Sequence, residues 1–113
     1  MSLLANKNAL ITGGTAGIGK AIALAFLQQG ANVAILGTNK EHAARVVEEL
    51  QVAKIHHQQR IESLLVDVSN KLEVDNIVKD LILSWISIDI LVNNAGITRD
   101  GLLIRMSEED FDR

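Results

Sequence analysis

Residues 12–19 of the chain read TGGTAGIG, a glycine-rich stretch directly after the short apolar run Ala9–Ile11. A segment with helical periodicity follows over residues 17–29, so the stretch joins a predicted strand to a predicted helix. Glycines at such a turn let the backbone approach a ligand closely, and the free N–H groups at a helix N-terminus favour a phosphate. The stretch therefore predicts a phosphate-binding turn.

The residues of this turn leave three interpretations open. A dinucleotide site usually has the spacing G-x-G-x-x-G, whereas the glycines here stand at positions 13, 14, 17 and 19. A P-loop is matched from Gly14 to Lys20 but fails at Ala21, which has no hydroxyl group for Mg²⁺. The third interpretation is a structural turn that binds no ligand.

Short apolar runs alternate with helical periods along the rest of the chain. Strands are predicted at 9–11, 33–36, 64–66 and 88–92, and residues 51–62 are predicted to form a loop. Capping-box spacing occurs at Thr38 with Glu41, at Asn70 with Glu73, and at Ser107 with Asp110, and it predicts three helix starts. The helix faces that we expect to be buried are Ile18, Ala21, Ile22, Ala25 and Phe26 in the first helix, Ala43, Val46, Val47 and Leu50 in the second, and Val74, Ile77, Val78, Leu81, Ile82 and Trp85 in the third.

This alternation predicts an α/β fold with a parallel sheet and helices on both faces. Right-handed crossovers then give the strand order 3-2-1-4. We expect a Rossmann-type doubly wound sheet that is incomplete, with about four strands, because such folds normally continue to six. The sequence then looks like the first half of a domain.

Composition excludes several classes of function. The chain has 113 residues, 14 acidic against 11 basic side chains, and no Cys, Pro or Tyr. Without a basic surplus we expect no nucleic-acid partner, and without Cys no disulfide or thiolate metal site. His56 and His57 have no third ligand nearby, so we expect a solvated loop there and no metal. No apolar run is long enough to span a membrane, and we expect a soluble, cytoplasmic protein.

Positions downstream of the glycine-rich turn favour the dinucleotide interpretation. The end of the second strand in such a fold meets the adenosine ribose, and Thr38 stands there with Lys40 close by. A neutral side chain tolerates a 2′-phosphate, which favours NADP over NAD. Asp67, directly after the third strand, either accepts a hydrogen bond from the adenine amino group or caps the helix near Ser69. Residues 93–96 read NNAG and end the fourth strand beside the first, where ligands bind.

At these positions the chain resembles the short-chain dehydrogenases/reductases. Residues 12–19 fit the family motif T-G-x-x-x-G-x-G, residues 93–96 fit N-N-A-G, and residues 67–68 fit the adenine-contact position. The run ITRDGLLIRM at 97–106 is similar to one branch, the bacterial 3-oxoacyl-[acyl-carrier-protein] reductases. The resemblance implies cofactor contacts by Gly13, Gly14, Thr15, Ala16, Gly17, Ile18 and Gly19 around the phosphates, Thr38 at the adenosine ribose, Asp67 and Val68 at the adenine, and Asn94, Ala95 and Gly96 beside the nicotinamide ribose.

The same resemblance implies that residues 1–113 are the N-terminal, dinucleotide-binding part of a single domain, truncated before its catalytic half, and it also implies an activity. Full-length members of that branch reduce 3-oxoacyl groups on acyl carrier protein with NADP(H) during fatty-acid synthesis, and they are usually homotetramers. NAD(H) stays open, because Ala16 stands where NADP-preferring members often have a basic residue. The family's catalytic Asn, Ser, Tyr and Lys match no position here, so these 113 residues alone are predicted to be inactive. Two alternatives remain: a short-chain dehydrogenase acting on a different ketone or alcohol, and a non-catalytic, truncated nucleotide-binding module.

Overall fold

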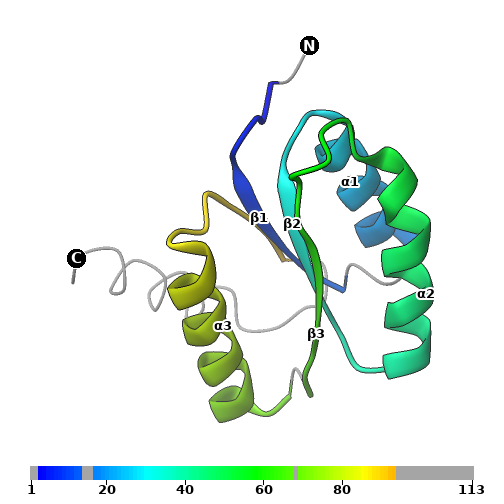
Figure 1. The fold of residues 1–113 in the computed structure, drawn as a ribbon. Helices are drawn as coiled ribbons and strands as arrows, with labels where there is room; N and C mark the ends of the chain where they lie inside the picture. Colours follow the sequence, from blue (N-terminus) through cyan, green and yellow to red (C-terminus); the bar gives the residue numbers. More distant parts are fainter. Residues whose placement is uncertain (1–2, 14–16, 68, 94–113) are drawn as a thin grey trace.

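The computed structural model describes residues 3–13, 17–67 and 69–93. Strands and helices alternate along this part of the chain (Figure 1). The elements in order are β1 (Asn8–Thr12), α1 (Gly17–Gln28), β2 (Asn32–Gly37), α2 (Lys40–Leu50), the 3₁₀ turn η1 (Gln51–Ala53), β3 (Ile61–Leu65), α3 (Lys71–Trp85) and β4 (Ile90–Asn93).

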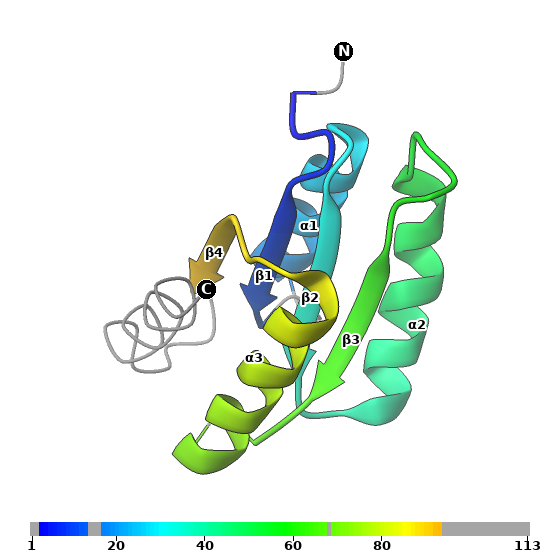
Figure 2. The same cartoon turned by 60° about the vertical axis from the view of Figure 1, so that its left-hand side comes forward.

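The four strands form one sheet in the order β3-β2-β1-β4, and every pair is parallel. Helices α1 and α2 cover one face and α3 covers the other (Figures 1 and 2). The predicted fold class and strand order are therefore confirmed. None of the helices in the described ranges has both the length and the apolar character needed to cross a membrane.

The two central strands supply core side chains to both faces. Because successive residues of a strand point to opposite sides, Leu10 and Leu36 join the layer under α3, whereas Ile11 and Ile35 join the layer under α1 and α2. Trp85 is buried in the α3 layer, as the apolar stripe of this helix predicted. A strand that is buried on both faces reads as a continuous apolar run, which is why the sequence revealed β1 and β2.

The predicted buried face of α1 is wrong. The structure buries Gly19, Ala23 and Leu27 of this helix, while Ile18 is 71% exposed and Ala21 and Ala25 are also exposed. Of the predicted residues, Ile22 and Phe26 are partly buried against the core. Apolar residues occur almost all round this helix, so the periodicity does not single out one face.

The cap of α2 also differs from the prediction. Asn39, and not Thr38, is the N-cap, because its Oδ1 accepts a hydrogen bond from the backbone N–H of His42 at 3.0 Å. The predicted cap of α3 is confirmed, since Oδ1 of Asn70 accepts from the backbone N–H of Glu73 at 3.1 Å. The Glu73 carboxylate, however, accepts from the backbone N–H of Asp67 instead of completing a reciprocal box.

Two strand boundaries differ from the prediction. β3 begins at Ile61, inside the predicted loop, and ends at Leu65, so Val66 lies just beyond it; β4 begins only at Ile90. β3 lies at an edge of the sheet and contains Glu62 and Ser63, so it lacks the continuous apolar run of a central strand. The helix predicted from Ser107 lies outside the described residues.

Candidate cofactor site

The carboxyl ends of β1 and β4 are tied together by a buried hydroxyl group. Thr12, the last residue of β1, is fully buried, and its Oγ1 lies 3.0 Å from Oδ1 of Asn93 and 3.3 Å from the carbonyl oxygen of Val92. Asn93 is the last residue of β4. These contacts hold the two strand ends side by side at the topological switch point of the sheet, where parallel α/β folds bind ligands.

The turn from β1 to α1 needs glycine at two positions. Gly13 has φ 70° and its backbone N–H donates to the carbonyl of Leu36 at 3.0 Å. Gly17, the first residue of α1, has φ 38°, and a Cβ added there would meet nothing within 4 Å. The helix therefore starts at an exposed residue that has open space at its Cβ position. A helix N-terminus of this kind fits a phosphate, because its N–H groups and partial positive charge face outward.

A second feature lies where β2 and β3 end. Thr38, Leu65, Val66, Asp67 and Glu73 line a cavity of about 380 Å³. It brings together Thr38 and Asp67, the two residues predicted to contact the adenosine. Both side chains are exposed, and the apolar Leu65 is 38% exposed beside them. An apolar side chain next to a carboxylate and a hydroxyl suits a flat heteroaromatic base that carries an amino group and a ribose.

Asp67 is held in its charged form by its neighbour. Its Oδ1 accepts from the Ser69 hydroxyl at 2.6 Å and from the Ser69 backbone N–H at 3.0 Å. These two hydrogen bonds lower the pKa of Asp67 below its ordinary value. Both use Oδ1, and within the described part of the chain Oδ2 accepts no hydrogen bond. Asp67 thus binds Ser69 but does not cap α3, whose N-cap is Asn70, and one oxygen is still available for a ligand.

The P-loop interpretation of the turn is not favoured by the position of Lys20. In a P-loop this lysine reaches the phosphates, but here its ammonium group pairs with the Glu49 carboxylate of α2. The hydrogen bond and charge of Lys20 lower the pKa of Glu49. Lys20 therefore links α1 to α2 through this ion pair.

The predicted cofactor residues fall into three groups. Gly13, Gly17, Ile18 and Gly19 lie at the β1–α1 turn, where Gly17 and Ile18 are exposed and Gly19 is buried. Thr38 and Asp67 share the cavity at the ends of β2 and β3. The remaining predicted residues, which lie outside the described ranges, are Gly14, Thr15, Ala16, Val68, Asn94, Ala95 and Gly96.

Leu65 and Glu73 also line the cavity and were not predicted as site residues. Leu65 could have been found once β3 was known to end there, because ligands bind beyond the carboxyl ends of parallel strands. For Glu73 the sequence predicted only a capping role. In the ranges 3–13, 17–67 and 69–93, no three His, Cys, Asp or Glu side chains are grouped so that they could hold a metal ion.

Comparisons with known proteins agree with this geometry. The family described as short chain dehydrogenase matches residues 7–113. The 3-oxoacyl-[acyl-carrier-protein] reductase FabG of Chlamydia trachomatis serovar D is 45% identical over 109 residues, which are 96% of this chain and 43% of that protein. The structure of NAD⁺-bound xylitol dehydrogenase superposes with a TM-score of 0.76 at 28% identity, over 83% of this chain and 35% of that one.

A metagenomic short-chain oxidoreductase in complex with NADP superposes with a TM-score of 0.74 at 30% identity, over 83% of this chain and 41% of that one. The chain thus spans less than half the length of each of these three proteins. The family match covers nearly all of the sequence, and the fold superposes on the two solved structures. The chain belongs to the short-chain dehydrogenase family.

Proposed function

We propose that this chain is the cofactor-binding part of an NADP(H)-dependent 3-oxoacyl-[acyl-carrier-protein] reductase. The reaction is the reduction of the 3-oxo group of an acyl chain carried on acyl carrier protein to a 3-hydroxyl group. Two lines of support are the chlamydial reductase at 45% identity and the sequence at 97–106. The observation that carries the proposal is the cavity shared by Thr38 and Asp67, close to the carboxyl end of the sheet from which α1 starts.

Each part of the site has a separate binding role. The exposed start of α1 holds the pyrophosphate through backbone N–H groups, and the open space at Gly17 admits it. Oδ2 of Asp67 accepts a hydrogen bond from the adenine amino group, while Leu65 packs against the ring. A reduced nicotinamide cofactor held in this way supplies a hydride for the 3-oxo group. These residues of the chain bind and orient, and none of them transfers a proton.

The preference for NADP(H) rests on Thr38. This side chain is exposed and uncharged at the end of β2, with Lys40 two residues later. An acidic residue there would bind the ribose hydroxyls and repel a 2′-phosphate. Solved relatives carry NAD⁺ in one case and NADP in another, so they do not discriminate between the two cofactors.

Catalysis requires groups that these 113 residues do not contain. The family resemblance implies a tyrosine as proton donor to the substrate oxygen, and the chain has no Tyr. We therefore propose that the chain binds cofactor but does not reduce a ketone alone. The cytoplasmic location, and the homotetramer implied for full-length relatives, stay predictions.

Calorimetric titration of the purified chain with NADPH and with NADH tests the proposal. We expect NADPH to bind more tightly than NADH, and Thr38→Asp to weaken NADPH binding by roughly tenfold, since a like charge a few ångströms from the 2′-phosphate costs about 1 kcal/mol in water and more near a protein surface. The matched control is Gln58→Asp, which adds the same charge at an exposed position before the start of β3, at the opposite end of the strands from Thr38.

Four results would count against the proposal. Binding of neither cofactor would refute the cofactor site, and equal effects of Thr38→Asp and Gln58→Asp would refute the role of Thr38. Turnover of a 3-oxoacyl thioester by the 113-residue chain would refute the claim that it lacks an essential proton donor. If the complete enzyme reduces other ketones but not acyl-carrier-protein substrates, the reductase assignment within the family is wrong.

A further inference from the structure

The outer edge of β3 presents backbone groups for another strand. Among the described strands, β3 pairs only with β2. The carbonyl of Arg60 accepts from the backbone N–H of Val33 at 2.9 Å, and the backbone N–H of Val66 donates to Gly37 at 3.0 Å. Backbone groups of successive strand residues point to alternate sides. The even-numbered residues therefore face β2, and Ile61, Ser63 and Leu65 direct their N–H and C=O groups outward.

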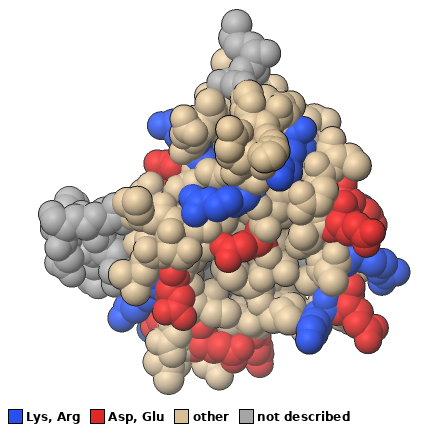
Figure 3. Space-filling view, in the orientation of Figure 1, with Lys and Arg blue, Asp and Glu red and all other residues tan. Residues whose placement is uncertain are grey.

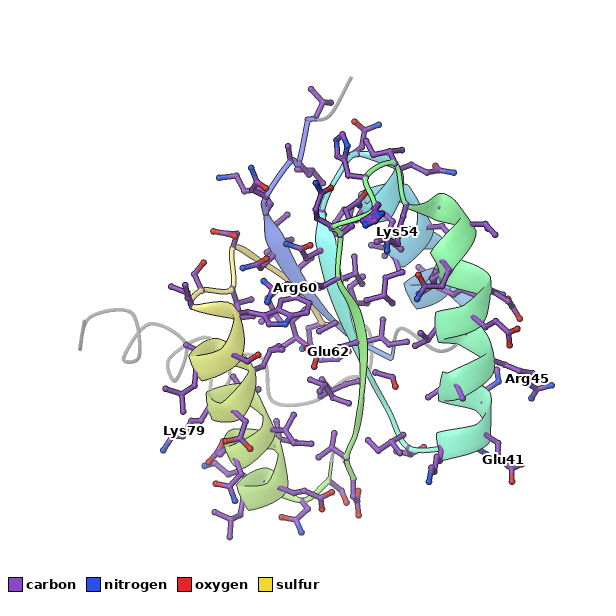
Figure 4. The ribbon with its side chains drawn as sticks, viewed as in Figure 1. Glu41, Arg45, Lys54, Arg60, Glu62 and Lys79 are labelled. Atoms are coloured by element: carbon purple, nitrogen blue, oxygen red, sulfur yellow. The ribbon has the colours of Figure 1, made fainter. Side chains whose placement is uncertain are left out.

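Two opposite charges lie along this edge. Arg60 and Glu62 are both exposed, and their even numbers place them on the α3 face of β3. Figure 4 shows them next to each other along the strand, and Figure 3 shows basic and acidic surface in contact in the middle of the same view. The Arg60 guanidinium lies 4.6 Å from the centre of the Trp85 ring, a cation–π contact that keeps it at this face.

Glu62 also belongs to a hollow of about 260 Å³ between β3 and α3. Its acidic members are Glu62 and Asp80, and its floor includes Leu64, Ile77 and Leu81. Two carboxylates above apolar side chains suit the side chain of an arginine, because its stem packs on apolar surface while its guanidinium binds carboxylates.

We propose that two copies of this chain pair through the outer edges of β3, antiparallel and with Ile61 opposite Ile61 of the second copy. In this register the two Ile61 residues exchange both backbone hydrogen bonds. Arg60 of each copy then lies opposite Glu62 of the other at a non-hydrogen-bonded position, where cross-strand side chains are closest. Each Arg60 is also brought to the hollow of the other copy, beside Glu62 and Asp80.

The charges select this register over the next one. Centring the pair on Ser63 would also match outward backbone groups, but it would place Glu62 opposite Leu64 and leave both arginines without an acidic partner across the strands. The two-fold symmetry of such a contact repeats the Arg60–Glu62 pair. The occupant of the edge is therefore a second copy of this chain, because its own strand carries the complementary charges at the required spacing.

Charge-swap variants test this contact by sedimentation velocity over a range of concentrations. We expect the wild-type chain to dimerise weakly, more at low salt than at high salt. Arg60→Glu and Glu62→Arg each place like charges opposite each other twice and are expected to weaken the dimer by about tenfold or more. The double variant Arg60→Glu/Glu62→Arg restores opposite charges and is expected to recover wild-type association.

Mixing the two single variants gives a sharper result. In a heterodimer of Arg60→Glu with Glu62→Arg, both cross-strand pairs are again opposite in charge, so the mixture should dimerise although each variant alone does not. The matched controls are Arg45→Glu and Glu41→Arg, exposed residues of α2 that change the net charge by the same amounts away from β3 (Figure 4). Circular dichroism verifies that every variant is folded.

A chain that stays monomeric at all concentrations would overturn the proposal and would show that the charges protect the edge from pairing. Association that the single variants leave unchanged would also overturn it, because the contact would then lie elsewhere, such as at the outer edge of β4. The same holds if the mixed single variants fail to associate. None of these measurements depends on cofactor binding, so their outcome is independent of the proposed reductase function.

Discussion

Replacement of Gln59 by glutamate should strongly destabilise the fold. Gln59 lies in the loop before β3, and its side chain is only 7% exposed. Its Nε2 donates to the carbonyls of Leu27 at 2.9 Å and Ala31 at 2.7 Å, at the end of α1. Its Oε1 accepts from the backbone N–H groups of Ile55 and His56, both at 2.7 Å. One side chain therefore joins the α2–β3 loop to the α1–β2 turn.

The magnitude follows from the two donated bonds. An ionised carboxylate has nearly the shape of the amide but donates nothing, so the carbonyl of Ala31 loses its donor, while the carbonyl of Leu27 keeps the backbone N–H of Gly30 at 3.0 Å. One buried, unsatisfied carbonyl costs about 1–3 kcal/mol, so the free energy of unfolding should fall by at least roughly this amount. Urea unfolding at neutral pH, followed by circular dichroism, measures the loss. Gln58→Glu is the control, because the adjacent Gln58 is exposed and its change should stay within about 0.5 kcal/mol.

The pH dependence separates this mechanism from a simple loss of packing. Burial and the two carbonyl oxygens should raise the pKa of the new carboxyl group in the folded state above its unfolded value of about 4.3, against the opposite effect of the N–H groups of Ile55 and His56. The charged form is the harmful one, so the deficit is largest above the folded pKa and shrinks as pH falls toward the unfolded value. A protonated carboxyl can donate to one carbonyl again. A deficit equal to that of Gln58→Glu, or one that stays constant with pH, would refute the reasoning.

Three further predictions concern local features. Asn39→Ala should lower the free energy of unfolding by about 1 kcal/mol because it removes the N-cap of α2, whereas Thr38→Ala should change it little. If urea unfolding shows the larger loss for Thr38→Ala, then Thr38 is the N-cap, as the sequence predicted. Gly17→Ala should lower the free energy of unfolding by about 1 kcal/mol, because the φ of 38° at this position disfavours a side chain although there is room for one. Calorimetric titration should also show weaker NADPH binding. Asp67→Asn should remove the stabilisation that the lowered pKa of Asp67 provides. This contribution is present above the unfolded pKa of the carboxyl group and is lost as pH falls through the folded pKa. The free energies of unfolding of wild type and variant should therefore differ at pH 7 and converge in acid. A constant difference in unfolding free energy at both pH values would contradict that cause.

The sequence alone determined the class of fold and the position of the first turn. Val33–Leu36 and Ala9–Ile11 are continuous apolar runs because their strands are buried on both faces. Once such strands alternate with helices, right-handed crossovers leave one strand order. The glycine-rich stretch was equally readable, because positive φ at Gly13 and Gly17 is a local requirement that glycine meets best.

The candidate site was only partly visible in the sequence. Thr38 and Asp67 were identified one at a time, each by its place after a strand. That they line one cavity with Leu65 and Glu73 depends on the pairing of β2 with β3 and on the position of α3, which contributes Glu73. The side chains of Thr38 and Asp67 are brought together by packing between segments that are far apart in the sequence. No local sequence pattern encodes this proximity.

Tertiary structure alone decided the buried face of α1, the start of β3 and the role of Gln59. Helix α1 is apolar nearly all round, so contact with the sheet, rather than periodicity, selected Gly19, Ala23 and Leu27. β3 is an edge strand with polar residues, and its pairing with β2 defines it more than its composition does. Gln59 reads as one polar residue in a polar loop; only the approach of the α1 end, with carbonyls that need donors, gives it four partners and a buried position.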